Sequence, residues 1–144
     1  MRINLFVDYP RAPKFERVRL TALVRRILKE EDKIADSINI VLVSDDYLLE
    51  VNRKFLNHNY RTDVISFDLA DTDSIEGEIY VSVDRARVQA RRYDVPLEKE
   101  VLRLIVHGVL HLCGWDDKTR SQKLRMRKRE NAFIESFFDR RDKG

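Results

Sequence analysis

The sequence predicts an α/β (α+β) protein with one mixed sheet of about four strands and about five helices. Runs of β-forming residues alternate with amphipathic helical patterns in the order strand, helix, strand, helix, two strands, then helices. The chain has 144 residues, 43% of them hydrophobic and 37% charged, which suits a folded protein rather than a disordered one. We therefore expect one domain over residues 1–144, without internal repeats or a linker.

The first half of the chain contains two expected strands, residues 3–7 and 38–42, each followed by an expected helix. The first helix follows Pro13 and has apolar residues at the i, i+3, i+4, i+7, i+8 spacing of a single buried face. Ser44 is the expected N-cap of the second helix, which should end near Asn57. The expected buried residues are Leu20, Leu23, Val24, Ile27 and Leu28 in the first helix, and Leu48, Val51 and Phe55 in the second.

The second half begins with a polar loop, residues 57–62, which leads into strands at 63–69 and 78–83. No long helical pattern separates these strands, so an antiparallel hairpin is expected. Asp84 is expected to cap a helix that ends near residue 93, and Pro96 suits the first turn of a helix that continues to residue 112. A final basic helix, residues 119–139, is expected to bury Phe133, Ile134, Phe137 and Phe138.

The stretch from 107 to 117, HGVLHLCGWDD, has the pattern of a metal site. On a helix, His107 and His111 leave the same face with Cβ atoms about 5 to 6 Å apart, close enough to bind one ion. Gly114 suits the end of that helix, and the returning loop can deliver the carboxylate of Asp117. Three protein ligands with a fourth position open are typical of a catalytic zinc site. We predict such a site, with its histidines on a helix.

The spacing also matches the long zinc-protease motif, so a zinc peptidase is one alternative. Those enzymes need a glutamate directly after the first histidine as general base. Gly108 occupies that position here, which argues for another proton-transfer group or for a substrate other than a peptide.

Three blocks of the sequence together resemble the YbeY family of metal-dependent endoribonucleases that mature ribosomal RNA. They are the stretch 107–117, TDVISF at 62–67 and GEIYVS at 77–82, and their order and spacing agree from about Asn52 to the end. Met126 and Glu130 also stand where the family pattern has a methionine and a glutamate. The resemblance implies a single-strand endoribonuclease involved in rRNA processing and ribosome maturation, with one zinc ion per chain in a cleft between helix and sheet.

The chain departs from the family pattern at two positions. Asp117 replaces a third histidine, and because a carboxylate hardens the ligand set, divalent metals other than zinc are also candidates. Leu56 replaces an arginine, so another basic residue must meet the phosphate. Arg53, Lys54, His58 and Arg61 are the nearby substitutes. The predicted catalytic residues are His107, His111 and Arg61, and the predicted metal ligands are His107, His111 and Asp117.

Several residues near the predicted metal site have alternative roles. Asp116 or His58 could replace Asp117 as a ligand, and Asp116 could instead orient a ligand. Cys113 is expected to be a small packing residue. Trp115 either packs the turn or stacks on a base. Thr62, Asp63 and Ser66 either cap and pack their strand or line a substrate groove.

The composition and the distribution of charge indicate which binding partners to expect. The net charge is only +3, but seven basic residues and one acid lie between Lys118 and Glu130, and Arg85, Arg87, Arg91 and Arg92 form a second cluster. Such basic runs are either solvated helix faces or contacts for RNA phosphates. A ribosomal subunit or its proteins are further candidate binding partners. The chain has no apolar run near 18 residues, so no membrane span is expected. Residues 1–10 lack a signal-peptide core, so a cytoplasmic location is expected. The single cysteine suits such a reducing compartment. A third reading is a ribosome-assembly factor that binds RNA and has a structural metal.

Overall fold

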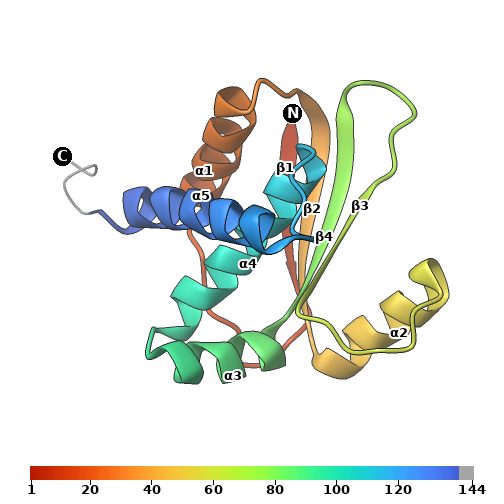
Figure 1. The fold of residues 1–144 in the computed structure, drawn as a ribbon, viewed down its shortest axis with the longest axis vertical. Coiled ribbons are helices and arrows are strands. Elements are labelled where there is room, and N and C mark those ends of the chain that lie inside the picture. The colour runs from red at the N-terminus through yellow and green to blue at the C-terminus, as the bar shows by residue number, and fades with distance from the viewer. Residues whose placement is uncertain (140–144) are drawn as a thin grey trace.

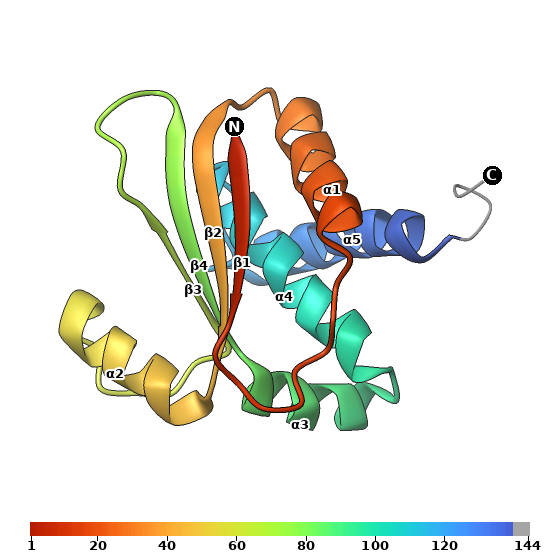
Figure 2. The same cartoon turned by 180° about the vertical axis from the view of Figure 1, so that it is seen from behind.

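The computed structural model describes residues 1–139, which form one four-stranded sheet and five helices (Figures 1 and 2). The predicted fold class and element order are confirmed, and residues 140–144 of the predicted domain lie outside the described part. The elements are β1 (Arg2–Val7), α1 (Arg17–Glu30), β2 (Ala35–Val43), α2 (Asp45–Leu56), β3 (Val64–Asp68), β4 (Ile75–Ser82), α3 (Val83–Tyr93), α4 (Leu97–Leu112) and α5 (Arg120–Phe138). None of these helices is both long enough and apolar enough to cross a membrane.

The sheet is mixed and has the strand order β1-β2-β4-β3. β1, β2 and β4 are parallel, with Ile40 of β2 opposite Leu5 of β1 and Ile79 of β4. β3 is antiparallel to β4, with Ser66 opposite Ile79, so the predicted hairpin is confirmed. β3 therefore forms one edge of the sheet.

The two faces of the sheet are covered unequally. Successive side chains of a strand point to opposite faces, so Ile40 and Leu42 join the main core while Val41 and Val43 pack in a second, smaller cluster. The main core is completed by α1, α3, α4 and α5, whereas α2 alone covers the other face (Figure 2).

α4 packs closely on the sheet because glycine stands at two contact points. A Cβ atom at Gly108 would lie 2.6 Å from Ile79 Cγ2, and one at Gly77 would lie 2.5 Å from Leu112 Cδ1. Both distances are shorter than normal carbon contacts. This close packing holds the histidine helix directly over β3 and β4.

Most helix ends follow the sequence signals. The Ser44 side chain accepts a hydrogen bond from the backbone N–H of Tyr47, and Asn57 ends α2 in the left-handed conformation. The expected cap at Asp84 was wrong. Ser82 is the N-cap of α3, and its side chain accepts from Arg85 N, which leaves Asp84 in the first turn.

Two burial predictions also need correction. Phe55 is 69% exposed because the last turn of α2 projects beyond the sheet (Figure 1). Asn52, one turn earlier, is buried instead. Phe133 and Ile134 are buried as expected, but Phe137 and Phe138 are only partly buried, at the end of α5 where fewer elements surround the helix.

Candidate metal centre and groove

The predicted ligands come together at the C-terminal end of α4. His107 and His111 occupy successive turns, with ring centroids 4.6 Å apart. Asp117 faces both, with Oδ2 at 3.2 Å from His107 Nε2 and Oδ1 at 3.5 Å from His111 Nε2. One donor atom from each residue lies within 4.8 Å of the others, and residues 1–139 contain no other group of three histidine, cysteine, aspartate or glutamate side chains this close together.

The chain reverses after α4 at Gly114, which has φ +102° and so adopts a conformation that favours glycine. The turn is tied down by Trp115, whose Nε1 donates to Glu31 Oε1 at 2.6 Å. Trp115 also packs against the main core, as its packing reading predicted. This anchored turn places Asp117 back over the histidines.

The donor set fits one divalent metal ion. Ligand atoms about 2.0–2.2 Å from a tetrahedral zinc lie roughly 3.3–3.6 Å from one another. The two separations of Asp117 oxygens from the imidazole nitrogens, 3.2 and 3.5 Å, are close to that spacing. Two imidazoles and a carboxylate would leave a fourth position for water or substrate.

Glu130 of α5 orients the first histidine. His107 Nδ1 and Glu130 Oε2 are 2.6 Å apart, and the glutamate is only 2% exposed. With Nδ1 held by a carboxylate, Nε2 is the nitrogen that faces Asp117. Histidine ligands in metalloproteins commonly have such a partner, which sets the tautomer and ring orientation.

A buried charge network continues from Glu130 into α4. Arg103 Nη1 donates to Glu130 Oε1 at 3.0 Å, and Arg103 Nε donates to Glu100 Oε1 at 3.0 Å. Burial by itself lowers the pKa of Arg103, but its hydrogen bonds and ion pairs with Glu100 and Glu130 outweigh burial and raise it. Arg103 is therefore a permanent cation that neutralises part of the charge of two buried carboxylates.

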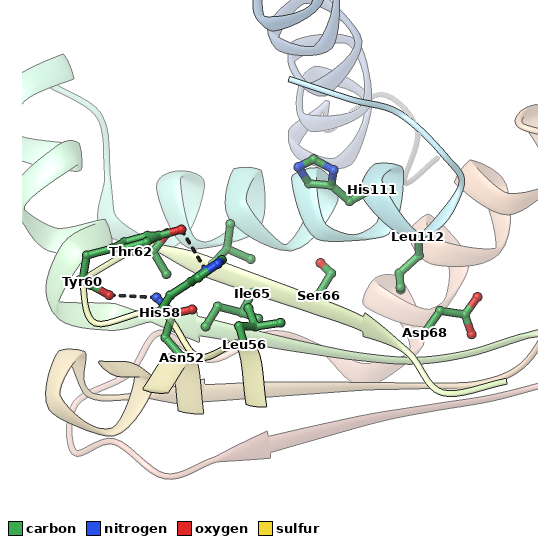
Figure 3. A pocket seen from close by; sticks show the side chains of 11 residues that line it. Asn52, Leu56, His58, Tyr60, Thr62, Ile65, Ser66, Asp68, His111 and Leu112 are labelled. Carbon is green, nitrogen blue, oxygen red and sulfur yellow. Dashed lines mark hydrogen bonds between the residues drawn. The ribbon is translucent and has the colours of Figure 1, made fainter. Parts of the chain in front are cut away.

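An open cavity of about 410 Å³ extends from the histidine helix along the edge strand β3 (Figure 3). His111 reaches it from α4, and the loop after α2 supplies His58 and Tyr60 (Figure 3). Its lining residues are Asn52, Leu56, His58, Tyr60, Thr62, Val64, Ile65, Ser66, Asp68, His111 and Leu112. We call this cavity the groove. Its volume is in the range of about 300–1,000 Å³ seen for ligand sites.

The candidate phosphate-binding residues differ in their position relative to the groove. Leu56, which stands where the family pattern has an arginine, lines the groove. Arg61 does not line it, since its guanidinium pairs with Asp45 at 2.7 Å and with Asp46 at 2.9 Å. These contacts raise the pKa of Arg61, most of all the hydrogen bond with Asp45. Arg53 pairs with Glu50.

The other candidate ligands are separated from the cluster. Asp116 is exposed, and neither it nor His58 joins the three donor residues within the described chain. Cys113 is buried, and burial raises the pKa of its thiol to about 11, so the thiol stays protonated at neutral pH. This agrees with its expected packing role.

Thr62 and Ser66 both line the groove, while Ser66 Oγ also donates to Gly108 O at 3.2 Å. Asp63 lies apart from the groove lining and accepts from Gln89 Nε2 at 3.1 Å. This stretch therefore has both of the expected roles, since Thr62 and Ser66 line the groove and the Asp63 carboxylate binds α3.

The sequence analysis missed Glu100, Arg103 and Asn52. A signal for the first two was present, because positions 100, 103, 107 and 111 repeat at three and four residues and so share one helix face. Asn52 left no such signal. Its role depends on the loop that folds back over α2, where Asn52 Nδ2 donates to Tyr60 O at 2.8 Å.

Comparisons with known proteins identify the family of this chain. The model of the family described as Endoribonuclease YbeY matches residues 9–137. The Endoribonuclease YbeY of Flavobacterium psychrophilum is 43% identical over 114 residues, covering 79% of this chain and 81% of that protein. That of Porphyromonas gingivalis is 33% identical over 133 residues, covering 92% and 88%.

A solved structure shares the fold. The solution structure of TM1509 from Thermotoga maritima superposes with a TM-score of 0.63 at 28% identity, covering 96% of this chain and 89% of that one. The family model covers most of the chain and agrees with the three sequence blocks that suggested the resemblance. The chain belongs to the YbeY family of endoribonucleases.

Proposed function

We propose that this protein is a metal-dependent endoribonuclease that cleaves single-stranded RNA, with a part in rRNA processing and ribosome maturation. One observation carries the proposal: His111 belongs both to the three-residue donor cluster and to the lining of the groove. A metal ion at the cluster would therefore be next to the space where a substrate strand fits. The names of the relatives supply the substrate class.

We propose zinc as the metal, held by His107, His111 and Asp117, with other divalent ions as candidates because of the carboxylate. When bound, such an ion supplies positive charge for a phosphoryl oxygen or activates a water molecule. Glu130 keeps the ring of His107 in the orientation that leaves Nε2 available. Arg61 would meet the phosphate by exchanging Asp45 and Asp46 for it, since both are its present partners.

The nucleophile is either water or the 2′-hydroxyl of the RNA. The two differ in their products, because attack by the 2′-hydroxyl leaves a 2′,3′-cyclic phosphate and direct attack by water does not. End-group analysis of the cleaved RNA distinguishes them.

Exposed basic residues of α5 support a polyanionic partner such as ribosomal RNA. Lys123, Arg125 and Lys128 are exposed, and none of them makes an ion pair within the described chain. Phosphate contacts of this kind strengthen binding without regard to sequence and weaken as salt rises. A cytoplasmic location is part of the same proposal and is supported by a single cysteine that is buried and unpaired.

The peptidase alternative has no support at the position that it requires. A glutamate in place of Gly108 would have its Cβ within 2.6 Å of Ile79 Cγ2, on the side of α4 that packs on the sheet. The assembly-factor alternative differs from the proposed function in making the metal chiefly structural. It predicts that His111→Ala lowers the melting temperature while the folded fraction still binds RNA.

The test is cleavage of a short single-stranded RNA by chelator-stripped protein, before and after zinc is restored. His111→Ala, purified in parallel, controls for contaminating ribonuclease. We expect activity to return with metal in the wild type and not in the variant. If one ion binds per chain and no activity returns, the nuclease proposal fails for this substrate.

A further inference from the structure

We infer that His58 and Tyr60 form a stacking platform for one nucleobase of the RNA, next to the nucleotide whose phosphate lies at the metal cluster. This inference rests on the proposed function and adds a subsite to it. The ligand is an unpaired base of a single strand, because a base within a duplex has both of its faces covered by its neighbours.

The two rings already have the geometry of a platform. Their centroids are 5.0 Å apart with an interplanar angle of 20°, so they are stacked. Tyr60 Oη and His58 Nδ1 are 3.0 Å apart and share a hydrogen bond (Figure 3). A base that stacks on this pair extends an existing stack and does not have to order two separate side chains.

The pair is held in place by its backbone, although its rings are exposed. Buried Asn52 binds the loop twice, since its Nδ2 donates to Tyr60 O at 2.8 Å and its backbone O accepts from His58 N at 3.1 Å. Tyr60 is nevertheless 57% exposed. Exposed aromatic rings on an anchored loop add little to the core, but they suit ligand binding.

The position of the pair relates it to the metal cluster. His58, Tyr60 and His111 all line the groove, with the aromatic pair on the α2 loop and His111 on α4 (Figure 3). No lysine or arginine is among the groove-lining residues in the described part of the chain. Without the metal ion, affinity inside the groove would come from stacking and hydrogen bonds, since Arg61, the predicted catalytic arginine, is paired with two aspartates.

The experiment measures binding of short single-stranded oligoribonucleotides to chelator-treated protein, so that cleavage cannot interfere. One series of oligonucleotides carries a single abasic ribose at each position in turn. The variants are Tyr60→Ala and Tyr60→Phe, with Tyr47→Ala as the matched control, because Tyr47 is a 48% exposed tyrosine of α2 that does not line the groove. Melting temperatures verify that each variant is folded.

We expect Tyr60→Ala to weaken binding about tenfold, as for loss of one base–aromatic stack. The RNA affinities of Tyr60→Phe and Tyr47→Ala should remain within about threefold of the wild-type affinity. An abasic ribose at one position of the oligonucleotide should weaken its binding to the wild-type protein. The same abasic ribose should not weaken binding to Tyr60→Ala any further, and its position identifies the stacked base. Equal effects of every abasic position in both proteins, or unchanged binding by folded Tyr60→Ala, would overturn the platform.

The two proposals fail in different ways. Binding that depends on Tyr60 without cleavage after metal is restored contradicts the nuclease proposal and leaves the platform standing. Cleavage with wild-type KM in Tyr60→Ala contradicts the platform and leaves the nuclease standing. If the wild type binds no single-stranded RNA at all, the platform is rejected.

Discussion

His107 Nδ1 and Glu130 Oε2 lie 2.6 Å apart, and this contact joins the two helices on either side of the candidate metal centre. The histidine comes from α4, and the glutamate comes from α5, after the turn that carries Asp117. The same glutamate binds Arg103, so the orientation of a ligand depends on a buried ion network. Metal affinity and stability of the fold should therefore respond differently to changes in this network.

Glu130→Gln should weaken metal binding about 10- to 100-fold, because a neutral partner makes His107 a poorer ligand and holds its tautomer less firmly. Competition with a chromophoric chelator measures the affinity. Glu135→Gln is the matched control, since Glu135 is exposed on the same helix. Equal affinities of Glu130→Gln and wild type would show that the contact does not act on the metal site.

Arg103→Met should destabilise the protein by about 3–5 kcal/mol, because it leaves two buried carboxylates without their cation. Glu100 and Glu130 are each only 2% exposed, so water cannot replace the lost partner. Urea denaturation measures the free energy of unfolding. Arg125→Met, at an exposed site of α5, should change it by less than about 0.5 kcal/mol. A loss below about 1 kcal/mol in Arg103→Met would contradict the burial argument.

Asp117→Ala and Asp116→Ala test which aspartate is the ligand. Asp117 oxygens lie 3.2 and 3.5 Å from the two imidazole nitrogens, whereas Asp116 is exposed outside the cluster. Loss of Asp117 should reduce metal affinity at least about tenfold, and loss of Asp116 should leave it within about threefold. Calorimetric titration with zinc checks both. The reverse order would assign the ligand to Asp116.

Leu56→Arg should strengthen binding of single-stranded RNA, because it places a positive charge inside a groove whose described lining has no lysine or arginine. One added phosphate contact should steepen the slope of log affinity against log salt by about 0.7. Phe55→Arg adds the same charge at the neighbouring, 69% exposed residue, which does not line the groove. If the two variants behave alike, the effect is one of overall charge and not of the groove.

Asp84→Asn should destabilise the fold at neutral pH by roughly 0.3–1 kcal/mol, because the amide oxygen can still accept the hydrogen bond but the negative charge beside the N-terminus of α2 is lost. Asp84 Oδ2 accepts from the first backbone N–H of α2, that of Asp45, at 2.8 Å. Burial alone would raise the pKa of Asp84, but this hydrogen bond and that from Tyr9 lower it below its ordinary 3.8. A lowered folded-state pKa means that the stabilisation is present above about pH 4 and is lost as pH falls through the folded value.

The measurement for Asp84 is urea denaturation of both proteins between pH 7 and pH 2. The difference in the free energy of unfolding between wild type and Asp84→Asn should be constant near pH 7 and become smaller toward pH 2. A difference that stays constant down to pH 2 would show that the carboxylate charge does not contribute.

The local patterns of the sequence determined the element order and brought three donor residues to one place. Helical period, strand alternation and the cap at Ser44 depend on neighbours in the chain, so the sequence alone predicts them. The donor cluster was also predictable for this reason, because His107, His111 and Asp117 lie within one helix end and the turn that follows it.

Only the tertiary structure decided what surrounds that cluster. Glu130 meets His107 across 23 positions, and the groove joins α4 with β3 and the loop after α2. Phe55 was expected inside because its helical spacing is right, but it is 69% exposed, and the only aromatic ring that it meets in the described part of the chain is that of Phe67 on the edge strand. Arg61 is near the groove in sequence, yet it pairs with Asp45 and Asp46. The periodicity of the sequence predicts which residues share one face of a helix or strand. Which residues contact that face depends on the packing of elements that are distant in the sequence.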